Sequence, residues 1–330
     1  MLTAGQRRRR ARAGRVRLAM LILAVAVAVG LILAGGNDGR THRAGPGVTA
    51  RGHGASAPHR DENPYGVALA PAGRRAHARF NHPPRGGLLF DLRSGQVLWA
   101  RDPTTPRPIA SVTKMMTALL VVEREPPTAT AFVTRAALHY RGSGVGLLPR
   151  GKRVGVTPLL YGLLLPSGND AARVLAQNVG RTIPRFVRLM NQRAQQLGLT
   201  CTHYVGPDGY SDYNHSCPRD LARLARAVMR EPRLRTIVAT SFAQFRFPIK
   251  GHKLYLAGHN PLDLLHYRGW TGIKTGYTPR AGECFVGTAR RGPIQLGVVL
   301  LNSPDAGRQA IKLLDRGFAA ERRPHVAQLG

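Results

Sequence analysis

The sequence predicts one α+β domain, in which an antiparallel sheet is covered by helices. Strand-like segments with alternating apolar residues occur early, at 87–102, and return late, at 272–302. Between them, apolar residues recur every three to four positions, which is the period of helices packed on a core. Strands that bracket a helical block in this way are typical of an antiparallel sheet flanked by helices.

The first ordered elements form a predicted β-hairpin. The segment GLLFDLRSGQVLWARD contains two short strands around a turn at Ser94-Gly95. After Pro108 the pattern changes to that of a helix, which we expect to end before Pro126-Pro127. The chain therefore builds part of the sheet before it enters the helical block.

Four helices are predicted next, and the chain then returns to the sheet. Thr157-Pro158 is a start signal, because a capping residue precedes a proline at the first helical position. The helical segments are 159–165, 170–179, 184–197 and 218–231. Turn residues then separate three strands and a last helix, at 272–278, 283–291, 294–302 and 305–318.

The N-terminal segment predicts a single membrane anchor. Residues 1–17 form a tail with seven arginines and no acidic residue, and residues 18–34 carry no charge. This apolar run is short for a spanning helix and long for the apolar part of a secretory signal, so cleavage remains an alternative. The positive-inside rule places the arginines in the cytoplasm and everything that follows outside it.

The composition divides the remainder into three parts. Residues 35–84 are rich in Gly, Pro, Ala, Arg and His without apolar periodicity, which predicts a flexible stalk. The domain is expected over 85–320, followed by a short tail at 321–330.

The net charge of +32 suggests an anionic partner. Only six of the 49 basic residues are lysine, a bias that is also typical of a GC-rich genome. A nucleic-acid partner would need a cytoplasmic chain, which the apolar run argues against, so none is predicted. An anionic wall polymer and a merely solvated basic surface remain open.

The cysteines and histidines predict a disulfide and no metal site. Cys201 and Cys217 are 16 positions apart, are flanked by turn residues and form the favoured pair outside the cytoplasm. Cys284 lies in an apolar strand and is expected in the core. The 12 histidines are scattered, and neither C-x-x-C nor H-E-x-x-H occurs, so no metal or cofactor is predicted.

A serine and a lysine lie three positions apart in the segment ASVTKMM, at 110–116. At this spacing Ser111 and Lys114 share one face of a helix, and a neutral lysine could take the proton of the serine hydroxyl. Lys114 is neutral only when it is desolvated or near another cation, and its apolar neighbours permit this. Taken alone, the pair is better explained as a capped helix start with a surface lysine.

Two further motifs change this interpretation. SGND places Ser167 and Asn169 at a turn between helices, and KTG lies at 274–276 in a late strand. S-x-x-K, S-D-N and K-T-G are the signature of penicillin-binding serine enzymes, and here the middle motif is S-G-N. The sequence resembles the D-alanyl-D-alanine carboxypeptidases, also in the blocks LLYGLLLPSGNDAARVLA and GIKTGYTPRAGECFVGTARR, over about 86–320.

The resemblance implies a β-lactamase/transpeptidase-like domain with an all-helical subdomain. It also implies a serine-type carboxypeptidase that removes the terminal D-alanine from peptidoglycan stem pentapeptides and is inhibited by β-lactams such as penicillin. The expected location is then the bacterial cell membrane, with a single pass and the catalytic domain outside the cytoplasm.

The same resemblance implies roles for the matching residues. Ser111 would form the acyl-enzyme and Lys114 would take its proton. Ser167 would relay that proton to the leaving amine, and Asn169 would orient Lys114 or the substrate amide.

A second group of residues is expected to bind the substrate. Lys274 and Thr275 would hold the terminal carboxylate, and Gly276 completes the motif on the edge strand. The N–H groups of Ser111 and Tyr277 would form the oxyanion hole. Arg308 is a candidate second carboxylate ligand, although an ordinary surface arginine explains it equally well.

Three alternatives remain open at this stage. A DD-endopeptidase would use the same motifs. A β-lactamase would need a carboxylate that activates water, and no glutamate occurs between 126 and 230, although PDGYSDYNH could hold a substitute. A non-catalytic wall-binding protein would have no need for all three motifs.

Overall fold

The computed structural model describes residues 63–69 and 75–322. The basic tail at 1–17 and the expected anchor at 18–34 lie outside the described residues. Within the described ranges, no helix is both long and apolar enough to cross a membrane.

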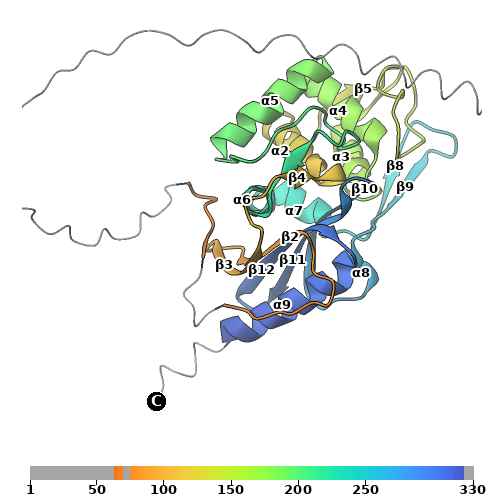
Figure 1. The fold of residues 1–330 in the computed structure, drawn as a ribbon. Helices are drawn as coiled ribbons and strands as arrows, with labels where there is room; N and C mark the ends of the chain where they lie inside the picture. The colour runs from red at the N-terminus through yellow and green to blue at the C-terminus, as the bar shows by residue number, and fades with distance from the viewer. Residues whose placement is uncertain (1–62, 70–74, 323–330) are drawn as a thin grey trace, which may run out of the picture. The chain divides into compact units, whose positions relative to one another are not determined.

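A six-stranded sheet is the centre of the domain (Figure 1). Its order is β1-β3-β2-β12-β11-β10, and neighbouring strands run antiparallel except for β1 and β3. The early hairpin and the late strands therefore meet at β2 and β12, which confirms the predicted α+β fold. The strands are β1 (Ala68–Leu69), β2 (Gly86–Asp91), β3 (Gln96–Arg101), β10 (Trp270–Thr278), β11 (Gly282–Arg291) and β12 (Ile294–Ser303).

Helices cover both faces of this sheet (Figure 1). One face carries a helical block, and α9 (Ala306–Arg322) lies on the other with the short α8 (Pro261–Leu264). The block confirms the expected helices and adds α7. Its members are α2 (Lys114–Arg124), α3 (Val156–Leu164), α4 (Asn169–Gly180), α5 (Ile183–Gln196), α6 (Pro218–Arg230) and α7 (Pro232–Val238).

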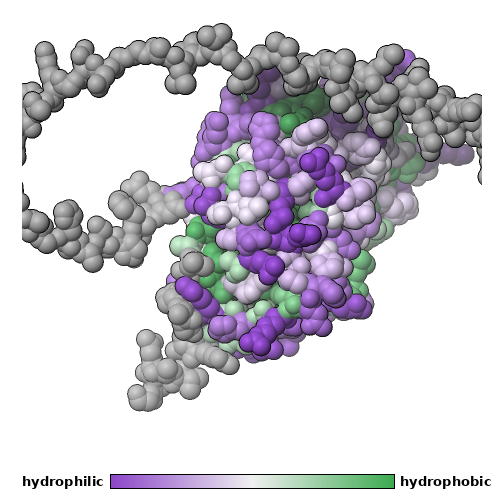
Figure 2. Space-filling view, in the orientation of Figure 1, coloured by the Kyte–Doolittle hydropathy of each residue, from purple (hydrophilic) through white to green (hydrophobic). Residues whose placement is uncertain are grey.

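The core follows from the alternation of side chains along the strands. In β2, Leu88 and Phe90 pack with the helical block, whereas Leu89 between them packs on the side of α9. β12 alternates in the same way, with Val299 on the first face and Val298 on the second. Because both faces are covered, most residues in these strands are apolar. Hydrophilic residues dominate the surface seen in Figure 2.

The described part of the expected stalk belongs to the domain, so the prediction of a flexible stalk up to residue 84 is wrong there. β1 pairs with β3, and Asn63 Nδ2 donates to the carbonyl of Leu197 at 2.8 Å. Ala76 is buried, and the ring of Phe80 meets that of Trp99 edge-on at 6.0 Å. A two-residue strand and isolated apolar residues are too short to produce a periodic pattern.

Three small two-stranded sheets complete the fold, and the sequence patterns did not predict them. Strand pairs of two or three residues give no measurable alternation, and the longest pair, β8 with β9, is exposed on one face. The pairs are β4 (Arg107–Pro108) with β7 (His215–Ser216), β5 (Thr130–Phe132) with β6 (Arg153–Gly155), and β8 (Phe242–Arg246) with β9 (Lys253–Ala257).

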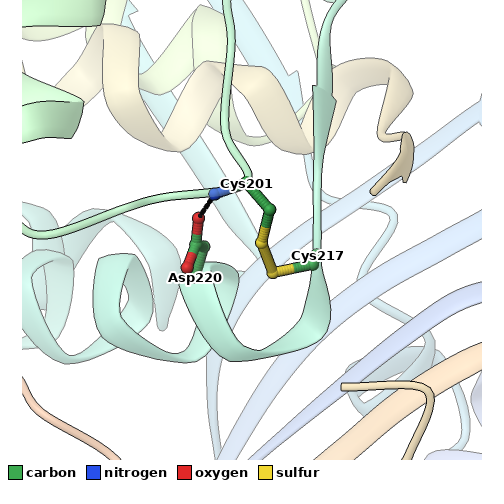
Figure 3. Close-up of side chains that lie close together, drawn as sticks. All are labelled: Cys201, Cys217 and Asp220. Atoms are coloured by element: carbon green, nitrogen blue, oxygen red, sulfur yellow. Dashed lines mark hydrogen bonds between the residues drawn. A yellow bond between two sulfur atoms is a disulfide. The ribbon is translucent and has the colours of Figure 1, made fainter. Parts of the chain in front are cut away.

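The expected disulfide joins Cys201 to Cys217 at the start of α6 (Figure 3). The carboxylate of Asp220, in the first turn of that helix, accepts a hydrogen bond from the backbone N–H of Cys201 at 2.7 Å. The disulfide therefore closes a loop over 201–217, and backbone carbonyls of this loop accept hydrogen bonds from Lys114 and Thr117. Cys284 is a buried free cysteine, as predicted.

Candidate active site

Ser111 and Lys114 lie where a short 3-10 helix, η2 (Ala110–Thr113), continues into α2. The Nζ atom of Lys114 is 2.9 Å from Ser111 Oγ. Lys114 is fully buried, so it is not the surface lysine that the pair alone would suggest. Its Nζ also donates to Asn169 Oδ1 at 2.6 Å and to the carbonyl of Asp208 at 2.5 Å.

Burial is the main influence on the charge of Lys114. Desolvation lowers the pKa of its amine from 10.5 to about 7, and the carboxylates of Asp208 and Asp170 partly oppose the shift. At neutral pH about half of the molecules therefore carry a neutral amine beside the serine hydroxyl. A neutral amine can accept a proton, which is the condition for a general base.

Ser167 occupies the turn between α3 and α4. Its backbone is left-handed, with φ of 65°, and its Oγ is buried without a hydrogen-bond partner among the described residues. An unpaired buried hydroxyl is costly, and a strained backbone adds to the cost. The arrangement leaves this hydroxyl available to a molecule that enters the site.

Asn169, the first residue of α4, holds Lys114 in place. Its Oδ1 accepts the bond from Lys114, and its Nδ2 donates to the carbonyl of Arg141 at 2.5 Å. The backbone N–H of Asn169 donates to the carbonyl of Ser143 at 2.9 Å. This asparagine therefore connects the lysine to the loop that precedes β6.

The KTG motif lies on β10, at the edge of the sheet. Burial and then the charge of Lys114 lower the pKa of Lys274, whose side chain is almost completely buried. A Cβ atom at Gly276 would lie 2.7 Å from the backbone nitrogen of Ser111, so only glycine allows the strand this close to η2. Tyr277 follows with its side chain exposed.

These elements surround a cavity of about 440 Å³. Five of the predicted site residues line it, whereas Lys114, Asn169 and Lys274 are buried and are not part of its lining. The lining residues are Ser111, Ser143, Pro166, Ser167, His259, Pro261, Thr275, Gly276, Tyr277, Glu283, Cys284, Ala306 and Gly307.

Arg308 is not among the residues that line this cavity, although its neighbours Ala306 and Gly307 are. Its guanidinium pairs with Asp305 at 3.2 Å, and its side chain is 82% exposed. The structure therefore does not bring Arg308 together with the other predicted residues.

The loop over 201–217 supplies contacts that the motifs did not reveal. The carbonyl of Pro207 accepts a hydrogen bond from Thr117 at 2.6 Å, next to the bond between Asp208 and Lys114. Asn214 is fully buried and donates to Thr113 Oγ1 at 3.0 Å. The turn-rich letters PDGYSDYNH were the available signal, but nothing in them indicated that backbone carbonyls would face the lysine.

Comparison with known proteins agrees with this geometry. The family model "D-alanyl-D-alanine carboxypeptidase" matches residues 76–305. The chain belongs to this family. The resemblance noted from the motifs is thereby confirmed, and so is the fold that it implied.

Individual relatives cover most of the chain. D-alanyl-D-alanine carboxypeptidase DacB2 of Mycobacterium tuberculosis is 35% identical over 256 residues, which are 75% of this chain and 86% of the relative. A D-alanyl-D-alanine endopeptidase of Pseudomonas aeruginosa is 35% identical, over 64% of this chain and 69% of the relative. Among solved structures, the Streptomyces K15 DD-transpeptidase superposes with a TM-score of 0.69 at 32% identity, covering 74% of this chain and all of the other.

Proposed function

We propose that this family member acts as a serine-type D-Ala-D-Ala carboxypeptidase through an acyl-enzyme on Ser111. One observation supports the assignment above others: a fully buried lysine, with a pKa near 7, lies 2.9 Å from the serine hydroxyl. Such a pair supplies both a nucleophile and the base that activates it. Neither a wall-binding protein nor a folding requirement explains why a cation should be desolvated there.

Acylation follows from this pair. The neutral amine of Lys114 takes the proton of Ser111, and Oγ attacks the carbonyl between the two D-alanines. The negative charge that develops on the carbonyl oxygen is bound by the N–H groups of Ser111 and Tyr277. The close approach of Gly276 supports this role, because no side chain separates β10 from the nitrogen of Ser111.

The amine of the leaving D-alanine needs a proton, and its carboxylate needs a binding site. Ser167 is proposed to relay the proton from Lys114, since its buried hydroxyl has no other partner among the described residues. Lys274 and Thr275 are proposed to hold the carboxylate. Arg308 would have to leave Asp305 before it could assist.

A pentapeptide ending in D-Ala-D-Ala tests the assignment. We expect the protein to release one D-alanine, and fluorescent penicillin to label it covalently. Ser111→Ala should abolish both. Labelling that survives in Ser111→Ala would mean that another residue is the nucleophile.

A DD-endopeptidase is the second candidate, because relatives of this name match the same part of the chain. Cross-linked peptide dimers offered beside the pentapeptide separate the two activities. Cleavage of dimers alone would replace the carboxypeptidase by the endopeptidase.

We also propose that the domain lies outside the cytoplasm of a bacterium, tethered through residues 18–34. The charge pattern of residues 1–34 supports this, and a disulfide between Cys201 and Cys217 is compatible with an oxidising compartment. Protease treatment of intact cells with a permeable wall should degrade the domain. A domain that survives until the membrane is opened would contradict the proposed topology.

A further inference from the structure

The β8–β9 hairpin presents one buried and one exposed face, at the right of the view in Figure 1. Its inner face packs on the helical block, where the ring of Phe245 meets that of Tyr161 at 5.0 Å. Every second residue points the other way. All of the outward residues are exposed, whereas the inward residues between them are buried or partly buried. The outward residues are Phe242, Gln244, Arg246, Lys253, Tyr255 and Ala257.

Two aromatic rings form a platform on this outer face. Phe242 is 56% exposed and Tyr255 is 55% exposed. Their rings are stacked, with centroids 6.2 Å apart and planes inclined by 27°. Removing large apolar side chains from water lowers the free energy of the system. Two adjacent exposed rings therefore suggest a surface that another molecule covers.

The polar residues of the same face are exposed. Arg246 and Lys253 lie directly opposite each other in the register of the two strands. Like charges at opposed positions destabilise a sheet, and neither side chain forms an ion pair with another described residue. Together with Gln244, they offer several hydrogen-bond donors beside the rings.

The hairpin that carries the platform leads directly into the candidate active site along the chain. The base of the hairpin is closed by a hydrogen bond of 2.7 Å from Gly258 N to the carbonyl of Ser241. The next residue, His259, lines the cavity together with Thr275. Phe242 is paired with Ala257, two residues before His259, which is about 7 Å along an extended chain.

We propose that this outer face binds the glycan strand, built of N-acetylated amino sugars, to which the stem peptide is attached. The inference rests on the proposed function, since it names the part of the substrate that lies beyond the cavity. The C–H groups of a sugar ring pack on the negative faces of aromatic rings, and acetamido carbonyls and hydroxyls accept bonds from the three polar side chains. A peptide strand would instead add to a sheet edge, and the rings lie on the face.

Binding can be measured without catalysis, in the Ser111→Ala protein. Purified glycan strands freed of their stem peptides are the ligand, and cosedimentation or calorimetry is the readout. Replacing both rings, Phe242→Ser with Tyr255→Ser, should weaken binding roughly 5- to 150-fold, because two ring contacts are lost. The matched control, Phe242→Tyr with Tyr255→Phe, keeps both rings and should bind as before.

Turnover gives the second arm, in the protein with Ser111 intact. The serine double variant should lose kcat/KM on glycan-linked pentapeptide by the same factor and keep it on free pentapeptide. Glycan binding that is absent, or equal in the two double variants, overturns the inference, as does equal loss on both substrates. If glycan binding behaves as expected but no D-alanine is released, the proposed function fails and the platform remains. If the serine double variant loses binding to anionic phospholipid vesicles but binds glycan strands as the control does, the inference is overturned and the face binds a membrane instead.

Discussion

Replacing Asn169 by aspartate should move the pH dependence of acylation upward without removing the nucleophile. The side-chain oxygen of Asn169 lies 2.6 Å from the amine of Lys114. In Asn169→Asp that oxygen belongs to a carboxylate, which favours the charged amine. Acylation needs the neutral amine, so the rate should rise with pH in both proteins, but later in the variant.

The size of the shift follows from the structure. The pKa of Lys114 is about 7, and an opposite charge this close raises a lysine pKa by about 1–3 units. The midpoint of the variant should therefore lie at about pH 8–10. At pH 7 its neutral fraction falls to roughly 10% at the smaller shift and 0.1% at the larger, so labelling slows roughly 5- to 500-fold.

The assay is the second-order rate of labelling by fluorescent penicillin, measured from acid to alkaline pH. Recovery at high pH separates a charge effect from a damaged site, because misfolding does not reverse with pH in this way. Asn169→Ala is the control: it removes the bond without adding charge, so its plateau should fall without an upward shift. A flat profile for the parent near pH 7, or an unshifted midpoint in Asn169→Asp, would refute Lys114 as the base.

Three further predictions concern the same elements. Lys114→Met should abolish labelling and leave the free energy of unfolding equal or higher. Because the unfolded chain alone binds the Lys114 proton between about pH 7 and 10.5, the parent should gain more stability with rising pH there than the variant, which keeps only the contribution of groups such as Lys274. Gly276→Ala should slow labelling, since its Cβ would lie 2.7 Å from Ser111 N. Replacing Cys201 and Cys217 by serine should cost about 3 kcal/mol in urea unfolding.

Each of these has a result that would contradict it. A pH dependence of stability unchanged in Lys114→Met would mean that another group titrates. Normal labelling by Gly276→Ala would show that β10 can move away from Ser111. Equal unfolding midpoints with and without the disulfide would show that other contacts already restrain the loop.

The sheet and the helical block could be predicted because their patterns are long. β11 and β12 each contain ten residues, and α5 has a capping threonine and an early proline. The β8–β9 hairpin could not, because its outer face exposes Phe242 and Tyr255, which breaks the usual relation between apolar residues and burial.

Part of the site was predictable for a different reason. Ser111, Ser167 and Lys274 belong to motifs whose chemistry depends on side chains, so the letters themselves indicate them. The carbonyls of Pro207 and Asp208 act through the backbone, which any residue could supply. Arg308 was expected only as a second basic residue for the carboxylate, and the sequence does not reveal that its guanidinium pairs with Asp305 instead.

The two buried amines of the site connect substrate recognition to the activation of the base. Charge on Lys114 lowers the pKa of Lys274, and electrostatic repulsion between two cations acts equally in both directions. In the proposed mechanism the terminal carboxylate pairs with Lys274 and stabilises its charged form. The negative charge of the bound carboxylate and the positive charge of Lys274 then act in opposite directions on the pKa of Lys114 and largely cancel there. The carboxylate can therefore bind at Lys274 without suppressing the neutral form of Lys114 that acylation needs, because its charge is balanced by the amine with which it pairs.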